Sequence, residues 1–166
     1  MKPWMSPIEI DFIKEYLSED KVMLEYGSGG STGFFPQFVK EYYSIEHVED
    51  WYEEVGEHLL TLPYKDKVHN YLIKPDYPRT IPTKYREFKS YIEYVDTINK
   101  KYDIVLIDGR ARAQCAEYVI PYLNDDAVVF IHDYYMRHSY RIVEKDYNIL
   151  GGVSHGQSIV ALTLKK

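Results

Sequence analysis

A glycine-rich turn early in the chain offers the clearest chemistry. The segment Glu25-Tyr26-Gly27-Ser28-Gly29-Gly30-Ser31-Thr32 directly follows the apolar run Val22-Met23-Leu24. Glycine permits positive φ and lets a ligand approach the backbone, and serine or threonine hydroxyls can cap a following helix. The pattern therefore predicts a ligand-binding turn between a strand and a helix.

The glycine spacing and the preceding acid indicate the class of ligand. Nicotinamide dinucleotides favour the pattern G-x-G-x-x-G, with the pyrophosphate over a helix N-terminus. Here the spacing of Gly27, Gly29, Gly30 and Gly33 departs from that pattern. Glu25 would repel a pyrophosphate but could bind the ammonium group of an amino acid. A cofactor with an amino-acid tail therefore suits the turn better than a dinucleotide.

Further titratable groups follow other apolar runs. Glu46 comes about 20 residues after the turn, where a carboxylate can accept hydrogen bonds from both ribose hydroxyls. Asp108 follows one apolar run, and His132 with Asp133 follows the next. Each of these three could help to remove a proton from a substrate hydroxyl. Asp108 and Asp133 could also share a divalent cation, but two acids alone do not make a metal site, so we predict none.

A locally basic set lies close to the same acids in the sequence. Arg110 and Arg112 follow Asp108, and Arg137 follows Asp133. Arginine donates in a planar fork, so these side chains could bind an anionic or hydroxyl-rich acceptor. The alternative is that they form salt bridges with nearby acids. The predicted acceptor contacts are Arg110, Arg112, Tyr134 and Arg137.

The elements that must position these residues alternate between strand and helix. We expect strands at 21–25, 43–46, 67–73, 103–108, 127–131, 147–150 and 158–164. We expect one helix that begins at Pro7 and further helices at 34–42, 51–60, 85–100, 112–123 and 140–145, with a proline-containing loop at 76–82. The inner strands are apolar on both faces, which is typical of a parallel sheet covered by helices. The predicted fold is a Rossmann-like, doubly wound α/β fold with helices on both faces. Its sheet is mostly parallel, with an antiparallel C-terminal strand. All parallel strands then end at one edge, where ligands bind.

Four segments together resemble the class I S-adenosylmethionine-dependent methyltransferases: the glycine turn, Ile45-Glu46-His47 with Trp51-Tyr52, the run 102–112, and the run 128–134. The resemblance covers the chain from about Lys21 to its end. It implies S-adenosylmethionine as cofactor, with His47 and Trp51 flanking the adenosine. The cofactor contacts are then Glu25, Gly27, Ser28, Gly29, Gly30, Ser31, Thr32, Glu46, His47 and Trp51. The set is also similar to small methyltransferases that modify sugars or glycans.

The leading hypothesis is an O-methyltransferase that acts on a hydroxyl, such as that of a sugar. Asp108 or His132 would remove the proton, and Asp133 would orient the histidine or the acceptor. An alternative is a non-catalytic module that binds S-adenosylmethionine and serves a partner protein. A nicotinamide-dependent oxidoreductase is disfavoured by the glycine spacing.

Size and composition bound these hypotheses. The 166 residues fit one domain, residues 1–166. The net charge of −6 does not favour nucleic acid, so we expect a small-molecule or glycan acceptor instead. The single cysteine, Cys115, excludes an internal disulfide and cysteine-based metal motifs. No apolar run approaches a membrane span, so we expect no membrane partner and a cytoplasmic location. The oligomeric state stays open.

Overall fold

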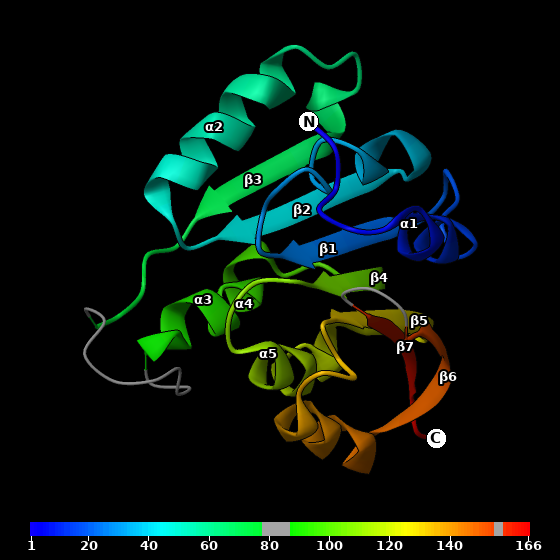
Figure 1. Ribbon diagram of the computed structural model, residues 1–166. Helices are drawn as coiled ribbons and strands as arrows, with labels where there is room; N and C mark the ends of the chain where they lie inside the picture. Colours follow the sequence, from blue (N-terminus) through cyan, green and yellow to red (C-terminus); the bar gives the residue numbers. More distant parts are fainter. Residues whose placement is uncertain (78–86, 155–157) are drawn as a thin grey trace.

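The described part of the chain forms one sheet of seven strands, in the order β3-β2-β1-β4-β5-β7-β6 (Figure 1). The structure is a computed structural model that describes residues 1–77, 87–154 and 158–166. The strands are β1 Val22–Tyr26, β2 Glu41–Glu46, β3 Val68–Leu72, β4 Tyr102–Ile107, β5 Leu123–His132, β6 Tyr147–Val153 and β7 Ile159–Leu164. β1 to β5 pair in parallel, whereas β7 is antiparallel to both β5 and β6. The predicted Rossmann-like fold class is therefore confirmed.

Helices cover both faces of the sheet, because successive strand residues point to opposite sides. The helices are α1 Pro7–Lys14, α2 Glu49–Leu60, α3 Lys89–Glu93, α4 Val95–Ile98 and α5 Arg112–Tyr118, with 3₁₀ turns at Phe35–Phe38, Lys65–Lys67, Ile120–Tyr122 and His138–Lys145. On one face α3, α4 and α5 pack on residues such as Leu24 and Val105. On the other face α1 and the first 3₁₀ turn pack on Met23 and Leu106. None of the described helices is long and apolar enough to cross a membrane.

The order of the strands defines where a ligand can bind. From β1 the chain adds β2 and β3 on one side and then returns to add β4 and β5 on the other. Such a reversal leaves a crevice outside the carboxyl ends of the two central strands. The glycine turn follows β1 and Asp108 follows β4, so both lie at this crevice.

Two of the predicted helices are wrong in extent. The segment 34–42 is not a helix: only Phe35–Phe38 forms a 3₁₀ turn, Val39 is extended, and β2 begins at Glu41. Pairing of the aromatic residues that follow with β1 overrides the helical pattern. The predicted helix 112–123 ends at Tyr118, since Pro121 disfavours helix at the residue before it. β5 then starts at Leu123, earlier than predicted.

Other boundaries differ for local reasons. Of the predicted helix 85–100, the described part is split into α3 and α4 at Tyr94, and Asn99 ends α4 with φ of +50°. Gly151 and Gly152 belong to β6 instead of the connection to β7. Residues 78–82 of the predicted loop and 85–86 of the predicted helix lie outside the described residues.

Candidate functional site

A cavity of about 460 Å³ lies at the carboxyl ends of β1, β2, β4 and β5. It brings together most of the residues singled out in the sequence: Gly27, Ser28, Gly29, Gly30, Ser31, Glu46, His47, Trp51, Asp108, Arg110, Arg112, His132 and Asp133. Trp4, Val48 and Gly109 complete its wall. Of the remaining predicted site residues, Glu25, Thr32, Tyr134 and Arg137 do not line this cavity.

The glycine turn depends on close backbone approach. Gly27 has φ of +97°, and a Cβ there would lie 2.6 Å from Cα of Gly109. The amide of Gly109 donates to Tyr26 O at 2.7 Å, which locks the end of β4 against the turn. A Cβ on Gly30 would clash with the carbonyl of Lys2, so the N-terminal segment crosses over this part of the turn. The absence of side chains at Gly27 and Gly30 therefore lets the backbone of Gly109 and of the N-terminal segment pack directly against the turn.

Glu25 lies beneath the turn, away from the ligand surface. Its side chain is fully buried, and Ser31 Oγ and Thr32 Oγ1 donate to its two oxygens, together with Ser44 Oγ at 2.8 Å. Burial raises the pKa of this carboxyl to about 7, although the hydroxyl donors partly offset that effect. Its expected contact with a cofactor ammonium is therefore replaced by internal hydrogen bonds. Thr32 is likewise buried and also accepts from the amide of Gly29 at 2.7 Å.

Glu46 presents one carboxylate oxygen to the protein and leaves the other free. The amides of His47 and Val48 donate to Oε1 at 2.7 and 2.8 Å. Among the described residues, none donates to Oε2, and Glu46 lines the cavity. A carboxylate oxygen left free at a strand end can accept hydrogen bonds from a ligand.

Two tryptophan rings close one side of the cavity. Trp51, on α2, donates from Nε1 to the carbonyl of Ser28 and so ties the helix to the glycine turn. Trp4 packs on it at 5.4 Å between ring centroids, and its side chain is 76% exposed. This arrangement provides apolar ring surface beside Glu46 and His47 in the cavity wall.

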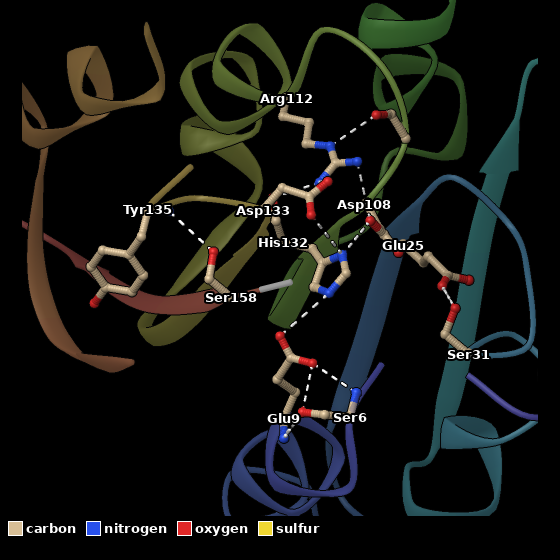
Figure 2. Close-up of polar contacts among 11 residues, drawn as sticks. Ser6, Glu9, Glu25, Ser31, Asp108, Arg112, His132, Asp133, Tyr135 and Ser158 are labelled. Atoms are coloured by element: carbon tan, nitrogen blue, oxygen red, sulfur yellow. Dashed lines mark hydrogen bonds and ion pairs between the residues drawn. The ribbon is translucent and has the colours of Figure 1, made fainter. Parts of the chain in front are cut away.

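A charged network joins the ends of β4 and β5 (Figure 2). His132 Nδ1 lies 2.9 Å from Asp108 Oδ1. Arg112 reaches across from α5, with Nη2 3.2 Å from Asp108 Oδ1 and Nη1 3.0 Å from Asp133 Oδ2. Asp133 has φ of +57°, and its backbone amide donates a hydrogen bond to Ser158 O at 2.7 Å. The network leaves Asp108 Oδ2 without a donor among the described residues.

The charges around His132 favour its protonated form. Burial lowers the pKa of the imidazole, but the hydrogen bond and charge of Asp108, with the charge of Asp133, outweigh it and raise the pKa overall. Arg112 acts in the opposite direction. A positively charged ring matches the carboxylates that surround it.

The same residues fit a metal ion poorly. Asp108, His132 and Asp133 could each offer one ligand atom, and these atoms lie within 4.8 Å of one another. However, the guanidinium of Arg112 contacts both carboxylates. A divalent cation would have to displace a positive charge that already neutralises its ligands, so we assign no metal to this cluster.

The predicted acceptor residues separate into three groups. Arg112 is held in the salt bridges just described and binds Gly109 O through Nε at 3.0 Å, so the salt-bridge alternative applies to it. Arg110 lines the main cavity and, with Arg137, a second cavity of about 200 Å³ beside it. Tyr134 is a correction: it is buried in the core and donates to Glu144 at 2.7 Å, so it cannot contact an acceptor in this arrangement.

One residue of this network was not among the sequence-predicted residues. Glu9, on α1, is fully buried, and its Oε1 lies 3.6 Å from His132 Nε2 (Figure 2). The available signal was the pattern Ser6-Pro7-Ile8-Glu9, a capping box at the start of a helix. That pattern predicts a cap but not that the helix end faces the site.

Comparison with known proteins adds evidence on the fold. No protein-family model matches the chain, and no curated protein matches it significantly. A methyltransferase-like protein from Silicibacter pomeroyi superposes with a TM-score of 0.77 at 23% identity, covering 99% of this chain and 89% of that one. A methyltransferase from Geobacter sulfurreducens gives 0.70 at 11% identity, covering 100% and 80%. An rRNA methylase from Streptococcus thermophilus gives 0.67 at 14% identity, covering 99% of both chains. The chain thus has the Rossmann-like fold of methyltransferase structures.

Proposed function

We propose that the protein is an S-adenosylmethionine-dependent methyltransferase that methylates a hydroxyl group. The observation that carries the proposal is the cavity of about 460 Å³ at the crevice of the sheet. It joins the glycine turn, the strand-end carboxylate of Glu46 and the carboxylate of Asp108, and each of these two carboxylates keeps one oxygen without a donor among the described residues. The methyltransferase structures that share the fold support the same class of activity.

The cofactor would bind along the glycine turn. The free Oε2 of Glu46 would accept hydrogen bonds from the ribose hydroxyls. The rings of Trp51 and His47 would contact the adenosine, and the turn residues 27–31, which line the cavity, would contact the amino-acid tail.

When bound, S-adenosylmethionine supplies an electrophilic methyl group, so the protein has to align the acceptor oxygen and remove its proton. Asp108 Oδ2 would remove the proton, because Asp108 lines the cavity and none of the described residues donates to this oxygen. His132 and Arg112 hold the other oxygen, Oδ1, and fix the carboxylate in place. Asp133 orients Arg112 from the opposite side.

The acceptor side supports a hydroxyl-rich or anionic substrate, such as a sugar or glycan. Arg110 extends between the two cavities, and Arg137 lies in the second one with its guanidinium over the ring of Tyr140 at 5.8 Å. In the described part of the chain, neither arginine forms a salt bridge. Unpaired guanidinium groups donate readily to sugar hydroxyls, carboxylates and phosphates.

Calorimetry and a methyl-transfer assay test this proposal. Titration with S-adenosylmethionine, its demethylated product and a nicotinamide dinucleotide should show binding of the first two only. Transfer of labelled methyl groups to a panel of neutral and acidic oligosaccharides should then identify the acceptor. The Asp108→Asn variant should bind cofactor and lose turnover. Near-normal turnover of this variant would exclude Asp108 as the base, and binding without transfer to any acceptor would favour the non-catalytic module.

A further inference from the structure

Glu9 is a buried carboxylate of α1, and its side chain faces His132 (Figure 2). The amide and hydroxyl of Ser6 donate to its Oε2 at 2.7 and 2.8 Å, which completes the capping box of α1. A glutamate can complete a capping box while its side chain remains on the surface of the helix. This one is fully buried and faces the carboxyl ends of β4 and β5 (Figure 2).

The second oxygen of Glu9 faces an equally unpartnered nitrogen. Glu9 Oε1 and His132 Nε2 are both buried without a hydrogen-bond partner, and they lie 3.6 Å apart. A buried polar atom without a partner is costly, so two such atoms facing each other favour a mutual hydrogen bond. A slight movement of either side chain brings the pair to hydrogen-bonding distance.

The other ring nitrogen determines what this contact does. His132 Nδ1 lies 2.9 Å from Asp108 Oδ1, so the ring is clamped between a carboxylate at each end. Neither nitrogen is left to reach an acceptor in the cavity. His132 therefore acts on Asp108 and not on the acceptor, and the orientation of its ring depends on the carboxylate behind it.

We propose that Glu9 is a positioning residue: it holds the Nε2 end of His132, so that Nδ1 keeps Asp108 fixed at the cavity wall. The inference rests on the proposed function for its catalytic consequence, while the contact itself rests on geometry alone. It also links the placement of α1 to the reactive carboxylate through one continuous chain of side chains. Second carboxylates that orient a histidine are a recurrent device at sites of proton transfer.

The groups that face His132 come from every element around it. Glu9 approaches from α1, Asp108 from the end of β4, Asp133 from the end of β5, and Arg112 from α5. Loss of the Glu9 charge removes a carboxylate whose Oε1 lies 3.6 Å from His132 Nε2. The ring should then lose its proton at lower pH.

Two variants separate this role from capping of the helix. Glu9→Gln keeps a capping-box side chain but removes the charge, since glutamine also serves at this position. Ser6→Ala is the matched control: it removes the cap donor and leaves the Glu9 carboxylate. Circular dichroism and thermal unfolding of both variants establish that they are folded.

The first readout is the ring ¹⁵N spectrum of His132 as a function of pH, which needs no enzymatic activity. In Glu9→Gln the titration midpoint of His132 should fall by about one pH unit, and in Ser6→Ala it should stay at the wild-type value. The proposal is overturned if the two variants give the same His132 spectrum.

The second readout is turnover. Glu9→Gln should lower kcat about tenfold, which corresponds to about 1.4 kcal/mol, and leave the Kd of S-adenosylmethionine unchanged. A wild-type protein that transfers no methyl group would refute the proposed function, but the ring spectra would still decide the role of Glu9. Unchanged kcat in Glu9→Gln with a shifted His132 midpoint would refute the catalytic consequence.

Discussion

Replacing Gly27 by alanine tests whether the glycine turn depends on backbone approach. Gly27 lies between β1 and the cavity with φ of +97°, a conformation that L-residues with a side chain rarely adopt. Its neighbour across the crevice is the backbone of Gly109, which cannot rotate out of the way as a flexible side chain could. Gly27→Ala therefore combines conformational strain with a steric clash.

The structure sets the size of the expected effect. Forcing a side chain into the left-handed region costs about 1–2 kcal/mol. A Cβ 2.6 Å from Gly109 Cα adds the cost of overpacking, about 1–3 kcal/mol. The free energy of unfolding should fall by about 2–5 kcal/mol, a large share of the roughly 5–15 kcal/mol typical of a folded domain.

Urea denaturation measures this difference, with the midpoint expected to fall by about 1–2 M. Two matched glycines serve as controls. Gly29→Ala in the same turn places its Cβ in ordinary van der Waals contact, 3.7 Å from Trp51 Nε1, and its urea midpoint should lie close to that of wild type. Gly56→Ala, within α2 and with no atom near its Cβ, should stabilise the protein by about 0.5–1 kcal/mol. A Gly27→Ala variant that unfolds at the same urea concentration as Gly29→Ala would refute the reasoning.

Four further predictions concern the cavity and the residues beneath it. Glu46→Gln keeps an oxygen for the amides of His47 and Val48 but loses the charged acceptor, so cofactor affinity measured by calorimetry should fall about 10- to 100-fold; an unchanged Kd would exclude the ribose contact. Both tryptophans of the chain line the cavity, so titration with S-adenosylmethionine should change the intrinsic fluorescence, and a flat titration would argue against binding there. Because Arg112 already neutralises the acidic cluster, EDTA should leave turnover unchanged, whereas a loss restored by Mg²⁺ would show that a metal is used. Burial raises the pKa of Glu25 from 4.5 to about 7, so its contribution to stability is fully present below pH 4.5 and is lost as the pH rises through 7. Between pH 4.5 and pH 8, the free energy of unfolding of Glu25→Gln, measured by urea denaturation, should therefore rise by on the order of 3 kcal/mol relative to that of wild type. A difference between the two proteins that does not change with pH would contradict the raised pKa.

The alternation of strands and helices was predictable because it depends on local patterns of apolar residues. Val105 and its neighbours in β4 form a continuous apolar run, which is typical of a strand buried on both faces. The helix predicted at 34–42 failed because tertiary pairing competes with local preference. Tyr42 pairs with Met23 in the sheet, and that long-range contact is not written in a local pattern.

The location of the site was predictable for a related reason. Parallel strands all end at one edge, so the residues that follow them, such as Gly27, Glu46 and Asp108, had to lie near one another. The direction of each side chain was not predictable in the same way. Tyr134 follows β5 as Asp133 does, yet it packs into the core, while Glu9 arrives from a helix whose docking the sequence pattern does not specify.

Glu25 and Glu46 show how an offset of two residues between neighbouring strands separates an acid buried beneath the turn from an acid at the cavity. Both come near the ends of neighbouring strands, and both are expected from the sequence to contact the cofactor, Glu25 at its ammonium group and Glu46 at its ribose. Glu25 is still paired within the sheet, opposite Ser44 on one side and Leu106 on the other, so its side chain stays under the turn that β1 leads into. Glu46 is the last residue of β2, where the amides of His47 and Val48 cap one oxygen and the other is free at the cavity. A buried acid with a pKa of about 7 supports the turn through its hydroxyl donors. Two residues further along in the register, Glu46 lines the cavity and keeps one oxygen without a donor among the described residues, and this offset decides which of the two acids faces the cavity.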